Sequence, residues 1–355
     1  MTAYILRRIL ILPVIMFGVT LLIFAMLMLL DPIERATLYV HDVPRTSDAV
    51  QRIIKKYGLN ESIPKQYWRW LVGTKDEMTG EVEGGILRGN LGWSHTAQMP
   101  VTEAILTKLP VTLELALWSI GPILASGIYV GIQAAVNHNK FIDQFSRVFA
   151  VVAWSFPTFV FALLMLMIFY SGTGWLPPES LSQWAKDIVW DTSIFTQYTK
   201  INTIDAILNW RWDVFLDAVR HLILPVFGLS YLIFAQVMRV MRSSMLETLR
   251  EDYIKTARAK GLSERVVRNL HARKNAMLPV VTIGGLLFIG LLTGVVITET
   301  IYNLHGLGRL FVDSAGSFDV VTLLGLVLFS SIVMVGGNLL VDVLYGFFDP
   351  RVRLS

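Results

Sequence analysis

Residues 9–30 read ILILPVIMFGVTLLIFAMLMLL and contain no charged side chain. A helix of about 20 apolar residues crosses the hydrocarbon layer of a bilayer and satisfies its own backbone N–H and C=O groups there. Arg7 and Arg8 precede the run, as in a signal peptide. The run is too long for one, however, and Asp31 and Pro32 follow it in place of a small-residue cleavage site. The stretch predicts a retained first membrane-spanning helix.

Five further apolar runs of similar length follow, at about residues 113–136, 149–170, 222–240, 280–301 and 321–344. None alternates between apolar and polar residues as the strands of a membrane barrel do. The whole chain is 54% hydrophobic and 16% charged, whereas an average soluble domain is roughly 25% charged. We predict an all-α integral membrane protein with about six transmembrane helices.

Basic residues near the spans predict the orientation, because cytoplasmic loops carry an excess of Lys and Arg. They gather at the N-terminus (Arg7, Arg8), between the second and third spans (Lys140, Arg147), at residues 239–274, and at the C-terminus (Arg351, Arg353). We therefore expect a multi-pass protein of the cell (inner) membrane with both termini in the cytoplasm. The same distribution accounts for the net charge of +4 without a nucleic-acid partner.

The sequence lacks the motifs that ATP-binding and catalytic sites require. No stretch reads G-x-x-x-x-G-K-[ST], H-E-x-x-H or G-x-S-x-G. There is no cysteine, and the six histidines never fall at metal-ligand spacing. We expect no catalytic residue, no metal and no cofactor on this chain, and an energy source outside it.

The most informative region is the polar stretch SSMLETLREDYIKTARAKGLSER, residues 243–265. Apolar residues recur at spacings of three and four, which predicts a helix with one apolar face, at Leu246, Leu249, Tyr253 and Ala257. Gly261 suits the C-terminus of this helix, because glycine readily adopts the left-handed conformation found there.

Ser263 can cap a second helix that runs towards Pro279. Two interpretations fit this helix-turn-helix. It is either an amphipathic hairpin on anionic lipid, which its basic residues favour, or a docking helix whose small residues let a partner approach the backbone. The residues alone leave both open.

The same stretch resembles the cytoplasmic EAA segment of ABC importer permeases, in the version of the oligopeptide/dipeptide/nickel family. Further matching words follow in the family's order at 4–9, 57–59, 89–94, 110–116, 155–159, 221–225, 275–279, 299–302, 306–309 and 349–353. Two departures from the general importer pattern, Lys255-Thr256-Ala257 in place of the first triplet and a longer interval from Gly261 to Pro279, are typical of the oligopeptide subfamily. The chain is similar to its B-type permease along nearly the whole length.

This resemblance implies a type I ABC importer permease fold with an extracytoplasmic subregion between helices 1 and 2. It implies four kinds of partner: a second homologous permease, two cytoplasmic ATPase subunits that bind ATP and Mg, an extracytoplasmic solute-binding protein, and the lipid bilayer. It also implies that the docking helix contacts an ATPase subunit through Tyr253, Thr256, Ala257, Arg258, Ala259, Lys260 and Gly261.

We accordingly divide the chain into a first helix (1–30), the extracytoplasmic subregion (31–110), a five-helix transmembrane domain (111–346) and a cytoplasmic tail (347–355). The transmembrane domain contains a cytoplasmic coupling loop (241–279) and an external loop (171–221). That external loop is longer and richer in tryptophan than is usual in peptide permeases, which leaves the solute open. Peptides are the default for the family and oligosaccharides the alternative.

Four polar residues near or within the spans are further candidates, since ionisable groups in a span usually have a partner or a purpose. Asn338 and Asp342 lie one turn apart after Gly336 and Gly337, which suits either the transport path or packing between helices, and we favour packing. Glu299 and Arg309 lie near external helix ends and are candidates for an outer gate.

Five tryptophans of the external loop region fit interfacial anchoring, contact with the binding protein, or stacking on a sugar, in that order: Trp175, Trp184, Trp190, Trp210 and Trp212. A secondary transporter or channel is the competing class. It would require ionisable residues in several helix centres or paired broken helices, and neither is evident in the sequence.

Overall fold

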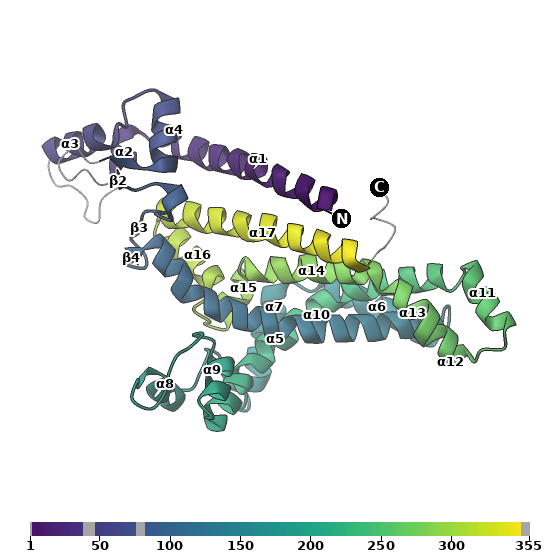
Figure 1. Ribbon diagram of the computed structural model, residues 1–355. Coiled ribbons are helices and arrows are strands. Elements are labelled where there is room, and N and C mark those ends of the chain that lie inside the picture. Colours follow the sequence, from purple (N-terminus) through teal and green to yellow (C-terminus); the bar gives the residue numbers. More distant parts are fainter. Residues whose placement is uncertain (1, 38–46, 76–81, 349–355) are drawn as a thin grey trace.

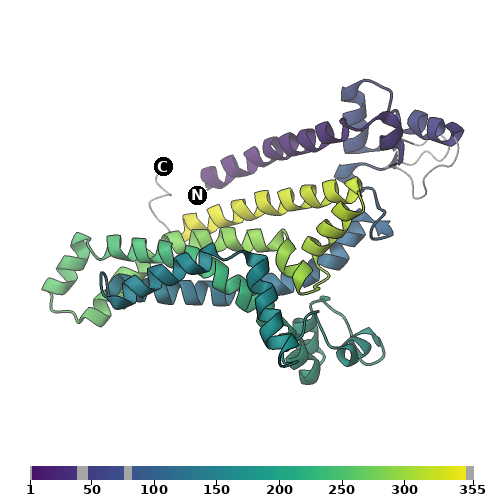
Figure 2. The same cartoon turned by 180° about the vertical axis from the view of Figure 1, so that it is seen from behind.

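The computed structural model describes residues 2–37, 47–75 and 82–348, and shows an elongated bundle of helices (Figures 1 and 2). Helices α11 (Asp252–Ala259) and α12 (Glu264–Val266) project from one end, called the α11 end below. The opposite end, called the α3 end, carries α2 (Pro32–Thr37), α3 (Ser47–Tyr57) and α4 (Ile63–Val72). The last residues of the predicted tail, including Arg351 and Arg353, lie outside the described residues.

Four helices are long and apolar enough to cross a membrane: α1 (Thr2–Leu27), α5 (Val101–Val136), α10 (Trp212–Thr248) and α17 (Val320–Phe348). Two bent pairs also pass this test, α6 (Phe141–Ser155) with α7 (Thr158–Leu166) and its π-helical extension η2 (Met167–Ser171), and the stretch Glu264–Ala276 with α14 (Leu278–Leu292). The described residues thus hold four to six candidate spans, in agreement with the predicted number. α1 begins, and α17 finishes, on the side of the α11 end (Figure 1).

The predicted span 149–170 is not one straight helix, because α6 and α7 meet at an angle of 92°. The bend falls at Phe156, which is extended (ψ 124°) and precedes Pro157. A residue before proline is disfavoured in the helical conformation, so the chain turns there although the apolar run continues. The predicted span 280–301 is interrupted as well: α14 ends at Leu292, and the short helix α15 (Val296–Ile301) follows Gly294.

Two long helices extend beyond the apolar runs that predicted them. α5 already begins at Val101, so the predicted boundary at 110 lies inside it. α10 begins at Trp212 and continues to Thr248, so the boundaries at 221 and 241 also fall within a helix. His221 therefore lies inside α10. Hydropathy marks only the apolar part of a helix, whereas its polar ends remain helical where other elements pack against them.

The main core lies between α5 and α10, which approach closely through two glycines of α5. A methyl group at Gly127 would lie 2.6 Å from Val237 Cβ, and one at Gly131 would lie 2.7 Å from Met241 Cβ. Small residues four positions apart allow this approach of two helix backbones. The same buried cluster continues through α10 and α14 to Ile254 and Ala257 of α11, so a single core connects the bundle with its projecting end.

The α3 end is joined to α17 by a network around Asp319. This end contains the antiparallel pairs β1 (Thr74–Lys75) with β2 (Val82–Glu83) and β3 (Trp93–Ser94) with β4 (Met99–Pro100), and the 3-10 turn η1 (Ile86–Arg88) between them. Asp319, just before α17, accepts hydrogen bonds from Ser94 Oγ (3.0 Å), Thr96 N (2.9 Å) and Thr322 Oγ1 (2.7 Å). The β3–β4 hairpin is thereby fastened to the first turn of the last helix.

A second folded unit, called the tryptophan segment (residues 171–211), also lies at the α3 end (Figure 2). It contains α8 (Gln183–Trp190) and α9 (Asn202–Leu208) around a separate apolar core that includes Leu181, Val189 and Phe195. Ser182 Oγ donates to Asp217 Oδ1 (2.7 Å) and lies 3.1 Å from His221 Nε2, which pins this segment to α10.

Candidate functional site

Helix α11 is attached to the bundle by one face. Ile254 is fully buried and Ala257 nearly so, and both belong to the main core together with Val267 and Ala272. Tyr253 is 40% exposed, and its hydroxyl accepts a hydrogen bond from Asn275 Nδ2 at 2.7 Å. Sequence periodicity predicted a helix from residue 243, but Leu246 belongs to the end of α10 and Leu249 is its C-cap. α11 itself begins only at Asp252, after the turn at residues 249–251.

The end of α11 has the geometry of a Schellman turn. The N–H of Gly261 donates to Arg258 O (2.9 Å), and the N–H of Leu262 donates to Ala257 O (3.4 Å). Gly261 adopts φ +77°, and a methyl group built on it would meet no atom within 4 Å. Its predicted position just past a helix C-terminus is confirmed. The chain requires glycine here for its backbone conformation and not for space within its own fold.

The turn is closed by one exposed ion pair, in which Arg258 Nε lies 2.7 Å from Glu264 Oε1. Ser263 takes the N-cap position of α12, but its hydroxyl makes no capping hydrogen bond. From there α12 continues into a π-helical stretch, η3 (Val267–Ala272), and then α13 (Arg273–Ala276). These elements form the return arm of a hairpin whose tip is Gly261.

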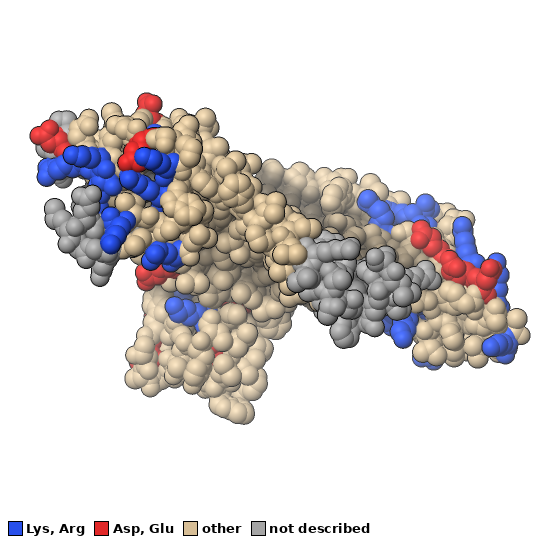
Figure 3. All heavy atoms as spheres, turned by 45° about the horizontal axis from the view of Figure 1, so that its top comes forward, with Lys and Arg blue, Asp and Glu red and all other residues tan. Residues whose placement is uncertain are grey.

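The seven residues predicted for docking fall into two groups. Ala257 faces the core of its own chain. The others are exposed and form the outer face of α11 and its turn: Tyr253, Thr256, Arg258, Ala259, Lys260 and Gly261. Charged side chains of both signs lie on this end of the molecule (Figure 3). The face therefore combines charged side chains with small residues at the tip, where another protein can approach the backbone.

A buried carboxylate near the α11 end was missed by sequence reasoning. Asp143, in the first turn of α6, is fully buried and accepts two hydrogen bonds from Arg242 of α10, at 2.6 and 2.8 Å. His138 Nδ1 (3.3 Å) and Arg147 Nε (3.6 Å) lie close to the same carboxylate. The basic residues of this region predicted only the orientation of the chain. Nothing in the sequence around Asp143 indicated that this carboxylate joins α6 to α10.

Glu299 and Arg309, predicted as a gate, are brought together, but not as an ion pair. Glu299 is fully buried and accepts hydrogen bonds from Thr112 Oγ1 (2.9 Å) and from the backbone N–H of Arg309 (3.1 Å). The Arg309 guanidinium instead donates to Asp313 on α16 (Leu307–Gly316), at 3.0 Å. Gly306 permits this arrangement, since a methyl group there would lie 2.5 Å from the Glu299 carboxylate. Glu299 thus joins α5, α15 and α16.

Asn338 and Asp342 lie on α17 where it crosses α14. A methyl group on Gly337 would lie 2.5 Å from Ile289 Cγ1, whereas one on Gly336 would meet nothing within 4 Å. Close approach of the two helices therefore depends on Gly337. The Oδ1 atom of Asn338 is buried, and no described residue donates a hydrogen bond to it.

The five tryptophans at and beside the tryptophan segment all point outward. Their exposed fractions range from 47% for Trp184 to 77% for Trp210. None of them belongs to the core of that segment, which is built from smaller apolar residues and Phe195. Among the described residues, no group of three His, Asp or Glu side chains is close enough to hold a metal ion.

Two family models match this chain. The sequence model of the family described as binding-protein-dependent transport system inner membrane component matches residues 127–354, and the model of the N-terminal part of such membrane components matches residues 1–116. Similar proteins include the di/tripeptide transport system permease protein of Pseudomonas aeruginosa (strain UCBPP-PA14), 35% identical over 99% of both chains.

The oligopeptide transport system permease protein of Bacillus subtilis (strain 168) is 34% identical over 99% of this chain and 100% of its own. The probable D,D-dipeptide transport system permease protein of Escherichia coli (strain K12) is 34% identical over 87% of this chain and 86% of its own. The similarity thus covers both ends of the bundle, including α11 and the region before α5.

Proposed function

Because the chain belongs to the family of binding-protein-dependent transport system inner membrane components, we propose that it forms half of the translocation path of an ATP-driven peptide importer. The single observation that supports this most directly is α11, an exposed helix whose buried face belongs to the core of the bundle. A partner that holds the outer face of α11 can move the long helices, because no flexible linker separates them.

In this proposal, two ATPase subunits bind ATP and Mg, and one of them holds α11. A second permease subunit completes the path, and a solute-binding protein delivers the solute at the α3 end. When the ATPases close on ATP, α11 moves with its ATPase and the helices switch between inward-open and outward-open packing. ATP drives the switch because the closed ATPase pair binds it more tightly than the open pair does.

The docking step is tested by cysteine labelling, because the natural chain contains no cysteine. In detergent, a maleimide should label Ala259→Cys in the isolated chain and fail to label it in the complex with the ATPases. Trp210→Cys, at the other end of the molecule, should be labelled equally in both samples and serves as the control. Equal labelling of Ala259→Cys with and without the ATPases would contradict the docking role.

The orientation is tested with the same two variants. We propose that the α11 end and both termini face the cytoplasm, which the basic residues of that end support. A membrane-impermeant maleimide applied to spheroplasts should label Trp210→Cys at once, and Ala259→Cys only after the membrane is opened. The reverse order would mean that the chain is inserted the other way round.

The peptide assignment is supported by what the relatives are named for: di- and tripeptides, oligopeptides and D,D-dipeptides. Oligosaccharides are the second candidate, because exposed tryptophan rings offer stacking surfaces for sugars. Calorimetric titration of the cognate solute-binding protein against a peptide series and an oligosaccharide series separates the two. Binding of oligosaccharides alone would refute peptide import and leave the coupling scheme intact.

A further inference from the structure

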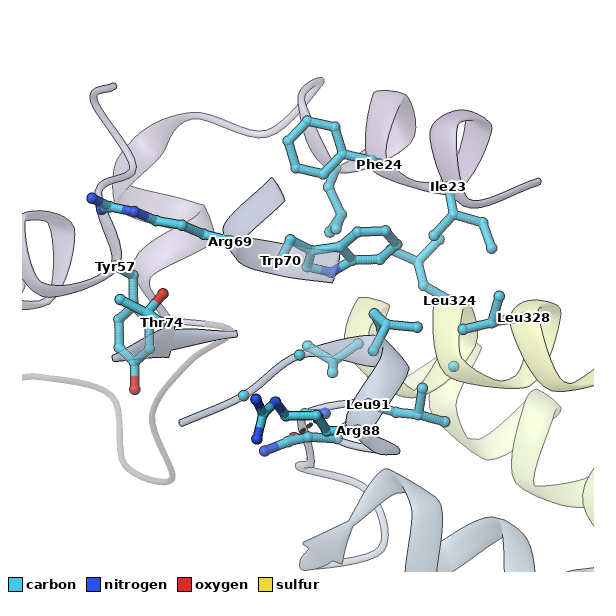
Figure 4. A pocket seen from close by; sticks show the side chains of 18 of the residues that line it. Ile23, Phe24, Tyr57, Arg69, Trp70, Thr74, Arg88, Leu91, Leu324 and Leu328 are labelled. Carbon is cyan, nitrogen blue, oxygen red and sulfur yellow. Dashed lines mark hydrogen bonds between the residues drawn. The ribbon is translucent and has the colours of Figure 1, made fainter. Parts of the chain in front are cut away.

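A cavity of about 770 Å³ lies at the α3 end between the first and last spans (Figure 4). One wall is apolar and comes from the membrane-spanning helices, with Ile23 and Leu27 on α1 and Leu324 and Leu328 on α17. The other wall carries three arginines, Arg35 on α2, Arg69 on α4 and Arg88 on η1. This volume lies within the range of about 300–1,000 Å³ that is usual for ligand pockets.

Arg35 is the strongest indication of what this cavity holds. Its side chain is only 8% exposed, and it donates to the neutral oxygens of Gln66 (Oε1, 2.6 Å) and Leu59 (backbone O, 3.5 Å). Its Nε atom is buried and has no hydrogen-bond partner. No described carboxylate lies within ion-pair distance of this guanidinium. A buried cation is costly unless it is paired, so the described residues leave this guanidinium open to an anionic ligand.

Among the described residues, the other two arginines add to the positive charge of the cavity. Arg69 is paired with Glu61 at 2.9 Å, whereas the described partner of Arg88 Nε is the backbone oxygen of Val72 at 3.1 Å. Lysine and arginine side chains also gather on the outer surface of this end (Figure 3). Guanidinium groups bind phosphate oxygens with two parallel hydrogen bonds, which makes an oxyanion of this kind the best match.

The apolar wall shows that the anion belongs to an amphiphile. Phe24, Tyr67 and Trp70 pack against one another beside the cavity: Phe24 and Tyr67 lie edge to face with ring centroids 5.3 Å apart, and Phe24 and Trp70 are tilted with centroids 5.6 Å apart. Tyrosine and tryptophan are enriched at the level of the lipid headgroups. On α1, Leu22 and Met26 lie on either side of Phe24 in the sequence and are exposed, so an acyl chain can continue along this helix.

We propose that this cavity binds the headgroup of an anionic phospholipid from the leaflet at the α3 end. The phosphate lies between Arg35 and Arg88, and the acyl chains run along α1 and α17. The lipid supplies a counter-charge for Arg35 that no described carboxylate provides, and it fills the space between the first span and the last. The inference does not depend on the solute or on the docking of α11.

The test uses the intact transporter complex, purified in detergent and stripped of lipid. Native mass spectrometry measures the binding of added phosphatidylglycerol and, in parallel, of phosphatidylcholine. Arg88→Gln should weaken phosphatidylglycerol binding about tenfold or more, as expected for the loss of one hydrogen bond between charged groups. Arg52→Gln on α3 removes the same charge outside the cavity and should leave binding unchanged. Arg88 is exposed, so its loss should not prevent folding.

Arg35→Gln should weaken phosphatidylglycerol binding more than Arg88→Gln does. If the Arg35→Gln complex does not assemble, the result for Arg88→Gln alone tests the proposal. Three results would overturn the proposal: equal binding of the two lipids to the natural complex, equal losses in Arg88→Gln and Arg52→Gln, or full displacement of phosphatidylglycerol by soluble glycerol 3-phosphate. The last would identify the site as one for a free phosphate compound.

Discussion

The turn at Gly261 allows the local backbone and a docked partner to be tested separately. At φ +77° an L-residue other than Asn or Asp costs about 1–2 kcal/mol, and the structure leaves open space around the position. Gly261→Asn should therefore behave almost as the natural chain. Gly261→Ala should lose no more than roughly fivefold to thirtyfold in binding-protein-stimulated ATP hydrolysis, the equivalent of that backbone cost.

Gly261→Glu carries the same backbone cost as Gly261→Ala and adds a long charged side chain. None of the chain's own atoms lies within 4 Å of the first added carbon, so the side chain can leave the turn into open space. Any loss beyond that of the alanine variant must therefore come from a partner. We expect Gly261→Glu to reduce stimulated hydrolysis to the unstimulated rate.

The assay is solute-dependent ATP hydrolysis by the complex in proteoliposomes with saturating binding protein, with subunit content checked on a gel. Stimulated rates that are equal for Gly261→Glu and Gly261→Ala would refute the reasoning, because they would show that no surface closes on the turn. Failure of Gly261→Asn to retain activity would show instead that the position requires glycine for another reason.

Three further predictions concern buried carboxylates and are measured by thermal unfolding of the purified complex. Asp143→Asn should lower the free energy of unfolding by about 3 kcal/mol, because Arg242 loses its charged partner. An equal loss of stability in the exposed variant Arg147→Gln would contradict this prediction. Glu299→Gln should cost about 1–3 kcal/mol, because its amide NH₂ would face N–H and O–H donors; unchanged stability would contradict the observed network. Burial tends to raise the pKa of Asp319, but hydrogen bonds from Thr96, Thr322 and Ser94 outweigh it and hold that pKa below the usual value. Its stabilising effect is therefore present above about pH 4 and lost as the pH falls further. Stability should drop more steeply in that range for the natural chain than for Asp319→Asn, and parallel curves would refute this.

The sequence was sufficient for the spans and for the tip of α11. Apolar runs of bilayer length predicted that lipid surrounds the chain and how many helices cross it, since few other structures need such runs. Gly261 was predicted as a helix end because its neighbours gave a clear period and glycine satisfies the turn. These features depend on local chemistry.

Features that depend on distant contacts were not predictable. Asp143 and Arg242 are far apart along the chain, as are Glu299 and Thr112, so no spacing rule connects them. The bend at Phe156 was obscured because the apolar run continues through Pro157. Ala257 looked like part of a docking face, yet only the packing of η3 against α11 determines which side of a small helix is covered.

Helix α10 connects the two ends of the molecule as one rod. It begins beside the tryptophan segment, is pinned there through Asp217 and His221, and reaches the turn that leads into α11. Its 37 residues make it roughly 55 Å long, so a tilt of about 5° displaces one end by about 5 Å relative to the other. Pro225 removes one backbone hydrogen bond partway along the helix, which makes this the position where α10 bends most easily. α10 thus gives a direct mechanical connection between α11 and the tryptophan surface at the far end of the molecule.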